Sequence, residues 1–173
     1  INYRTDIVNS RTAFSTNYFL TPNKKKVLHI GELYFLLKLK NNFSFKAGRY
    51  YRDFSQYLND DLSSGSLLFS KNAQAMPKIG LSFKKKLKRF KNFNYELGFT
   101  NGLFDTNQFY SSSPFLHEKF AYLNFENEIN SFGIGFVHEA MWGGTTLQGM
   151  GLGKQPSTFR DFLKVIISAD GPL

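Results

Sequence analysis

The residues that most often carry catalysis or bind metals are scattered along this chain of 173 residues. The chain has no Cys, which excludes a cysteine nucleophile, a thiolate metal site and a disulfide scaffold. His29, His117 and His138 lie far apart and lack the spacing of metal ligands. No G-x-S-x-G motif marks a hydrolase nucleophile. These residue types predict no metal site and no cofactor.

The densest cluster of charge is a basic run near the middle of the chain. Its members are Lys84, Lys85, Lys86, Lys88, Arg89 and Lys91. Because Phe90 and Phe93 are interleaved with it, the run taken alone is typical of nucleic-acid binding. In the barrel interpretation the run lies on a short-turn rim at the periplasmic side, where it can meet inner-leaflet phosphates or simply be solvated. We favour a solvated face and predict no nucleic-acid partner.

The aromatic content limits the class of protein. Phe and Tyr number 20 and 9, yet the mean hydropathy is −0.32. Charged residues are only 20% of the chain, which excludes a coiled coil and a charged disordered tail. No apolar run is long enough to predict a transmembrane helix.

Apolar and polar residues alternate with a period of two along most of the chain, a pattern that indicates β-strands. Leu33, Phe35 and Leu37 share one parity, for example, while Glu32 and Lys38 share the other. Many of the segments are about ten residues long, which suits a tilted crossing of a bilayer. The expected strands lie at 11–20, 27–40, 43–48, 78–84, 93–100, 118–126, 132–137 and 163–168.

Short and long connections alternate between these strands. The links at 41–42, 87–92 and 127–131 are short, and Asn41 with Asn42 is a good turn pair. The links at about 53–77, 101–117 and 142–160 are long. An up-and-down antiparallel barrel with tight turns at one rim and large loops at the other has this alternation. The link at 21–26 should be long but is only moderate.

The composition of the two parities bears on which face meets lipid. One parity is rich in Phe, Leu, Ile, Val and Tyr, and the other in Gly, Lys, Glu, Ser and Asn. In an outer-membrane barrel the apolar face points to lipid and the lumen is polar, whereas a soluble barrel has the reverse arrangement. We therefore favour an all-β, antiparallel up-and-down transmembrane β-barrel. The alternative is a soluble all-β domain with an aromatic core.

Several segments, taken in order, carry a family resemblance. They are Gly48 with Arg49, residues 61–67 (DLSSGSL), 70–79 (SKNAQAMPKI), 135–144 (GFVHEAMWGG) and 156–163 (PSTFRDFL). Together they resemble the capsule assembly protein Wzi family of Gram-negative outer membranes, over a stretch from about Val27 to the C-terminus.

The resemblance implies a non-catalytic outer-membrane barrel lectin that retains capsular or other surface polysaccharide. The barrel of that family has more strands than the roughly eight expected here. Residues 1–173 would then form part of a single barrel domain, from the middle of a larger barrel. No enzyme activity is expected. Lipopolysaccharide and outer-membrane lipid are the other expected partners, with Lys24, Lys25 and Lys26 available to lipid phosphates or an acidic glycan.

Polar residues near the long loops are the candidate carbohydrate-binding groups. They are Arg49, Arg52, Ser64, Ser66, Asn72 and Glu139. A guanidinium can bridge sugar hydroxyls or a uronate carboxylate through its fixed fork of donors. For Arg49 we favour a structural role instead, as an ion pair with Glu32, Glu96 or Glu139 that holds the long loop to the wall. The Ser and Asn groups can equally let that loop fold inward as a plug.

Trp142 and Glu139 are expected on opposite faces of one strand. Trp142 shares the parity of Phe132, Ile134 and Phe136, so we favour a girdle residue at the membrane rim over a platform for a sugar ring. Glu139 has the other parity and should face the lumen. A membrane channel or transporter, a barrel hydrolase acting on lipid or glycan, and a soluble basic nucleic-acid binder are the remaining alternatives.

Overall fold

The computed structural model describes residues 2–8, 11–20, 28–51, 75–90, 92–105, 109–147 and 151–169. Its main feature is an antiparallel eight-stranded sheet in the order β1-β2-β3-β4-β5-β6-β8-β9. The strands are β1 (Asn2–Val8), β2 (Thr12–Leu20), β3 (Leu28–Lys38), β4 (Phe43–Arg49), β5 (Pro77–Lys86), β6 (Phe93–Leu103), β8 (Phe115–Glu126) and β9 (Ser131–Trp142). The predicted all-β, antiparallel class is confirmed.

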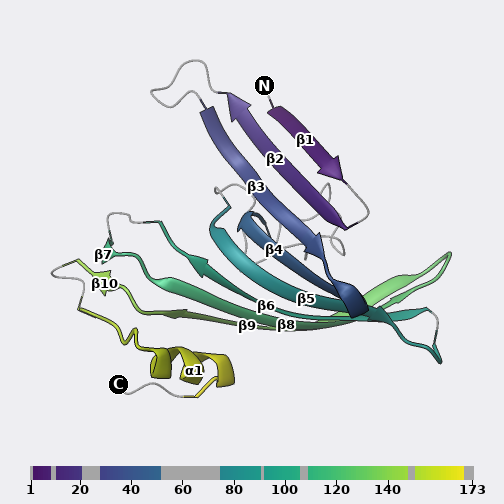
Figure 1. Cartoon of the computed structure of the whole chain (residues 1–173). Helices are drawn as coiled ribbons and strands as arrows, with labels where there is room; N and C mark the ends of the chain where they lie inside the picture. The colour runs from purple at the N-terminus through teal and green to yellow at the C-terminus, as the bar shows by residue number, and fades with distance from the viewer. Residues whose placement is uncertain are drawn as a thin grey trace.

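The sheet is curved and open. Figure 1 shows β1, β2 and β3 rising steeply from the layer formed by β6, β8 and β9. Within the main sheet each strand pairs with the next one along the chain, and β6 pairs with β8 because the small strand β7 (Tyr110–Ser112) lies outside this sheet. Strands β1 and β9 are the two edges of the main sheet, so the described residues do not form the closed barrel that the sequence suggested.

The alternation of short and long connections is confirmed in space. The connections β3–β4, β5–β6 and β8–β9 are short and lie at one end of the sheet, while the longer ones lie at the other end (Figure 1). A 3-10 turn, η1 (Lys40–Asn42), makes the β3–β4 link, with Asn41 and Asn42 at φ values of 59° and 68°. Asn tolerates this left-handed backbone better than most residues do, which explains the turn.

The longer connections are joined to one another. The strand β7 lies between β6 and β8 and pairs with β10 (Thr145–Thr146), which follows β9. Thr145 also forms a bridge with Lys154. Two connections that are separate in the sequence therefore form one small sheet.

The sequence analysis missed one strand and assigned one element incorrectly. Strand β1 was not expected, and residues 163–167 of the expected strand 163–168 lie in helix α1 (Phe159–Ile167), with Ser168 as its C-terminal cap. The side chain of Thr158 accepts a hydrogen bond from the Asp161 N–H, and the Asp161 carboxylate accepts from the Thr158 N–H. This capping box starts a helix and outweighs the short alternation that follows it. The count of about eight strands agrees with the sheet only because these two errors cancel.

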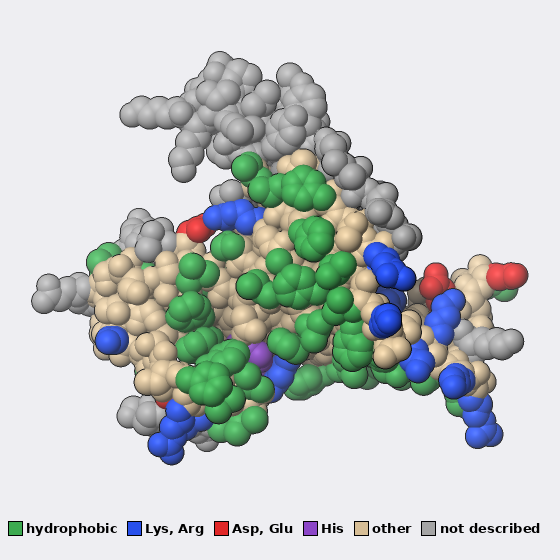
Figure 2. All heavy atoms as spheres, in the orientation of Figure 1, with side chains coloured by type: hydrophobic (Ala, Val, Ile, Leu, Met, Phe, Trp, Pro, Cys, Tyr) green, Lys and Arg blue, Asp and Glu red, His purple; other side chains and the backbone are tan. Residues whose placement is uncertain are grey.

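The pairing register separates an apolar face from a polar face. Phe45, Leu81 and Phe99 share one row across three strands. The neighbouring row on the other face contains Lys46, Gly80 and Thr100, followed by Glu118 and Glu139. On the apolar face Phe136 is 66% exposed and Ile134 is 73% exposed, and Figure 2 shows hydrophobic side chains spread widely over the surface.

Burial in the sheet is the reverse of that in a soluble domain. Among the described residues the buried polar or charged side chains are those of Ser15, Lys78, Thr100, His117, Glu118 and Asn124. Most of them lie on the polar face, whereas the large hydrophobic residues are extensively exposed. Because exposed apolar area of this extent is rare on a soluble monomer, this face requires an apolar environment or a partner.

Candidate functional site

The centre of the polar face holds a cluster of tyrosine and lysine side chains. The Lys46 ammonium lies 4.1 Å from the ring centroid of Tyr34 and 4.4 Å from that of Tyr50. The Lys78 ammonium lies 4.7 Å from the Tyr50 centroid, and the two tyrosine rings meet edge to face at 6.0 Å. Cation–π attraction strengthens when the groups are removed from water, as the buried Tyr50 and Lys78 are. The ammonium groups therefore occupy the ring faces that a sugar would otherwise stack on.

Gly80 makes room for this cluster. A Cβ at Gly80 would lie 2.5 Å from Cγ2 of Thr100 and 2.7 Å from the Tyr50 hydroxyl oxygen. Only glycine lets the Tyr50 side chain approach the wall so closely. Tyr50 follows the end of β4, so this contact holds the start of the long β4–β5 connection against the polar face.

Glu139 lies on the polar face, as its parity predicted. It is directly opposite Glu118 in the β8–β9 pair. Glu118 is only 1% exposed and continues the row of Gly80 and Thr100. The sequence could have indicated this pair of carboxylates, because the alternation within each strand places both of them on the polar face. That they lie directly opposite each other depends on the register of the β8–β9 pair.

Arg49 has different partners from the ones expected. Its Nη2 atom lies 3.3 Å from Oδ1 of Asp105, and its Nη1 atom donates to the carbonyl oxygen of Ala75 at 3.1 Å. The expected partners Glu32 and Glu96 bind elsewhere. Glu32 accepts from the Tyr51 N–H at 2.9 Å, and Glu96 lies 3.5 Å from the Lys84 ammonium. Arg49 does connect the wall to the long connections, but through Asp105 and Ala75.

The local electrostatics of this rim also affect Tyr51. Burial and, to a smaller extent, the nearby Glu32 carboxylate raise the pKa of the Tyr51 hydroxyl. Tyr51 therefore stays protonated well above neutral pH and can act as a neutral hydrogen-bonding group at this rim.

Several candidate residues lie outside the described part of the chain. These are Arg52, Ser64, Ser66, Asn72 and the basic group Lys24, Lys25 and Lys26. The proposed inward folding of the long loop concerns the same undescribed segment. Pro77, by contrast, begins β5, at the strand terminus where its missing N–H is tolerated.

A second site lies on the apolar face, beneath helix α1. The Phe162 ring is 6.1 Å from the His117 ring and 5.3 Å from the Trp142 ring, which stacks on Phe115 at 4.8 Å. The Lys119 ammonium donates to the Ile166 carbonyl at 2.6 Å and to the Ser168 hydroxyl at 2.7 Å. Trp142 has the parity expected of a girdle residue, but it also serves as the docking point of α1.

Polar groups are buried in the layer under α1. His117 is 2% exposed, and its Nδ1 atom lies 2.9 Å from Oδ1 of Asn101. Within the described ranges, no hydrogen-bond partner faces Nε2 of His117, Nδ1 of His138 or Nε1 of Trp142. These groups interrupt a largely apolar face, and Phe162 of α1 packs against two of them, His117 and Trp142. The sequence could have indicated polar groups on this face, because His117, Lys119 and His138 share the parity of the apolar residues. It did not reveal that helix α1 packs over this face.

The part of the chain that the structure describes contains no candidate metal site. No three His, Asp or Glu side chains there are close enough to hold a metal ion. None of the helices in that part is long and apolar enough to cross a membrane. Comparison with known proteins adds no identity, since no family model, curated protein or solved structure matches the chain.

Proposed function

We propose that this chain forms part of the wall of an outer-membrane β-barrel that binds and retains capsular or other surface polysaccharide without catalysis. The observation that carries the proposal is the reversed burial of the sheet, with an exposed apolar face and a sheltered polar face. A transmembrane barrel needs this arrangement, because its outer surface meets hydrocarbon and its lumen is wet.

The lengths and connections of the strands support the membrane assignment. Strands β3, β5, β6, β8 and β9 have 10 to 12 residues, and a tilted membrane strand needs about 9–11. The short turns gather at one end, as at the periplasmic rim of such barrels. Edge strands β1 and β9 cannot stay unpaired in lipid, so we propose that further strands complete the barrel.

The assignment to polysaccharide rests on the resemblance to the Wzi family and on the organisation of the long connections. Arg49 with Asp105, and β7 with β10, join these connections at one rim. Such a rim can present hydroxyl, amide and charged groups to a repeating glycan. Many weak contacts along one polymer give strong retention through multivalency.

The membrane assignment is tested with two adjacent residues of β5. Leu81 belongs to the apolar face and Ser82 to the polar face, at the same depth of the strand. An arginine on the lipid face near the bilayer centre costs about 2–4 kcal/mol, and one in the lumen costs far less. In a Gram-negative host, Leu81→Arg should be lost from urea-washed outer membranes, and Ser82→Arg should remain. Equal recovery of both variants contradicts a membrane wall.

The polysaccharide assignment is tested by retention on the capsular polysaccharide of the protein's own host. The detergent-purified protein should bind that polymer on beads and ignore an unrelated neutral polymer. Absence of binding would count against the proposal. The polymer should also keep its length after incubation, because shortening would indicate a hydrolase. A steady single-channel conductance in planar bilayers would favour a channel instead.

A further inference from the structure

The short-turn end of the apolar face carries a band of aromatic rings. Phe83 lies between Phe43 and Tyr95, at centroid distances of 4.9 and 5.6 Å. Phe125 lies between Phe93 and Phe132, at 5.0 and 4.9 Å. These rings come from β4, β5, β6, β8 and β9, so the band crosses most of the sheet. Aromatic rings at a common height are typical of the boundary between hydrocarbon and headgroups.

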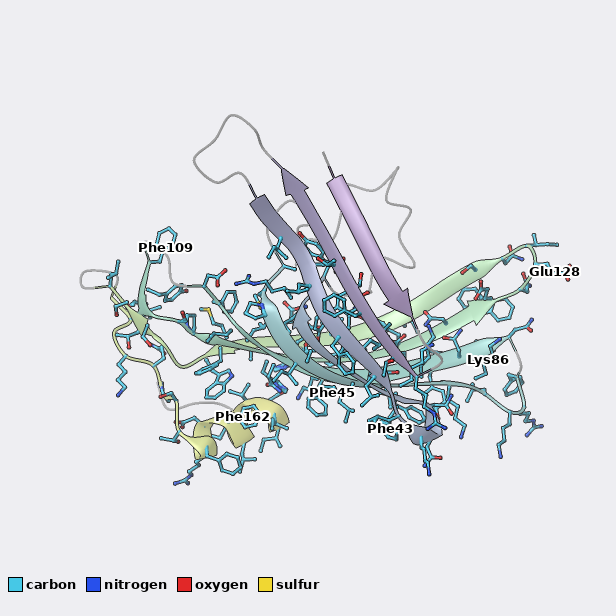
Figure 3. The ribbon with its side chains drawn as sticks, turned by 45° about the horizontal axis from the view of Figure 1, so that its top comes forward. Phe43, Phe45, Lys86, Phe109, Glu128 and Phe162 are labelled. Atoms are coloured by element: carbon cyan, nitrogen blue, oxygen red, sulfur yellow. The ribbon has the colours of Figure 1, made fainter. Side chains whose placement is uncertain are left out.

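Exposed basic residues lie immediately beyond this aromatic band. They are Lys38, Lys40, Lys84, Lys85, Lys86, Lys88 and Arg89. The Arg89 guanidinium lies 5.9 Å from the Phe90 ring centroid, which joins the basic rim to the aromatic residues. Figure 3 shows Lys86 at the same end of the sheet as Glu128, with Phe109 at the other end. The basic groups therefore follow the aromatic band in the direction of the headgroups.

Lys85 has the most informative position. It is directly opposite Tyr95 in the β5–β6 pair, on the row that continues to Leu123 and Ile134. Its side chain therefore shares the apolar face with residues proposed to contact lipid. Lys84 and Lys86 have the other parity, and Lys84 is paired with Glu96. Within the described ranges, neither Lys85 nor Lys86 has an ion-pair partner.

A polar cavity of about 370 Å³ opens beside these lysines. It is lined by Asn42 of the β3–β4 turn and by residues at the short-turn ends of β5, β6, β8 and β9, namely Lys84, Lys85, Lys86, Asn94, Glu126 and Ser131. Apart from Asn42 and Lys85, these residues belong to the polar face. The lining includes three lysines and one glutamate, so its net charge is positive, and its Asn and Ser side chains are neutral hydrogen-bonding groups. Ammonium and amide donors around a cavity suit the oxygens of a phosphodiester.

We propose that this basic rim, made of Lys85, Lys86, Lys88 and Arg89 at the β5–β6 turn and the strand end before it, binds the phosphate headgroups of anionic phospholipids. The lipids belong to the leaflet that the short turns face, so the inference rests on the proposed membrane function. Free phosphate is not the favoured ligand, because the lysines adjoin the aromatic band, where the acyl chains of the same lipid have an apolar surface to pack on. Basic residues next to a membrane surface attract anionic lipid in this way.

The test uses the complete barrel protein, that is, this chain together with the further strands proposed above, inserted in phosphatidylcholine vesicles that contain a photoactivatable phosphatidylglycerol. After illumination, crosslinks are mapped by mass spectrometry to the peptides that span the β5–β6 turn. We expect labelling there by the anionic probe and about tenfold less in the double variant Lys85→Gln with Lys86→Gln. The matched control, Lys154→Gln with Lys164→Gln, removes two exposed or partly exposed lysines distant from this turn and should label like the wild type.

Each other outcome decides against the inference in a distinct way. Equal labelling by photoactivatable phosphatidylcholine, or labelling unchanged in the double variant, overturns the headgroup site but leaves the membrane function intact. Displacement of the probe by inorganic phosphate shows a site for free phosphate instead of lipid. A complete barrel protein that fails to insert into the vesicles overturns both proposals, and the amount of vesicle-bound protein measures this separately.

Discussion

Arg49 and Asp105 link two connections that are 56 residues apart in the sequence, through an ion pair of 3.3 Å at the rim of the sheet. Arg49 ends β4, and Asp105 follows β6. Since the same guanidinium also donates to the Ala75 carbonyl, one side chain holds the start of β5 and the start of the next long connection.

Arg49→Gln should loosen this rim with only a modest loss of global stability. An exposed ion pair contributes about 0–1 kcal/mol, and a hydrogen bond adds about 1 kcal/mol. We expect faster amide hydrogen exchange in the peptide that contains Ala75 and Met76. Arg89→Gln, at the opposite rim, is the control and should leave that peptide unchanged. If Arg49→Gln lowers polysaccharide retention while this exchange stays constant, Arg49 is a contact residue for the glycan and not a structural tether.

Lys119→Met should release the end of helix α1. The ammonium makes hydrogen bonds to the Ile166 carbonyl and the Ser168 hydroxyl, and charged hydrogen bonds of this kind contribute about 2 kcal/mol. Because Trp142 is the only Trp and lies against Phe162, its fluorescence reports on docking of the helix. We expect a shifted emission and faster exchange across 159–169. Lys154→Met, an exposed position, should show neither change.

Docking of α1 should also depend on acidic pH through Asp161. Hydrogen bonds from the Thr158 hydroxyl and the Thr158 N–H hold the pKa of the Asp161 carboxyl below its usual value. Its folded pKa lies below its unfolded one, so the capping contribution is complete at neutral pH. It disappears as the pH falls below the usual Asp value of about 3.9 and through the lowered pKa.

The measurement is a titration of Trp142 fluorescence from neutral to acidic pH, compared between the wild type and Asp161→Ala. Asp161→Ala should already show the undocked signal at neutral pH and should lack the acidic step. Asp105→Ala, which removes an exposed carboxylate far from the helix, should keep the step. An acidic step of equal size in Asp161→Ala would assign it to another group.

Gly135→Ala should destabilise the sheet through Tyr122. The Tyr122 ring lies over Gly135 on the polar face, in the space that a Cβ would occupy. Forcing one extra methyl into such a contact costs about 1–3 kcal/mol. In a Tyr122→Ala background the same change should cost much less, because the clashing ring is absent. Equal costs in the two backgrounds, measured by chemical unfolding, would show that the ring does not impose glycine at this position.

The strands and their faces could be predicted from sequence because those properties are local. Leu81 and Ser82 point to opposite faces whatever the rest of the chain does, since side chains alternate along an extended backbone. The turn at Asn41 and Asn42 was predictable for a similar reason, because these residues tolerate a left-handed backbone. The helix was also encoded locally, in Thr158 and Asp161, but the alternation of Leu163, Val165 and Ile167 imitated a strand.

The sequence by itself therefore determined the two-faced sheet and the alternation of short and long connections. It also determined that Glu139 and Trp142 lie on opposite faces of the sheet. Only the tertiary structure decided that Arg49 pairs with Asp105, that the lysines Lys46 and Lys78 cover the tyrosine rings, and that α1 lies over His117. These contacts join residues that are distant in the sequence. Their geometry depends on the register and curvature of the whole sheet, and a period of two residues contains no information about either.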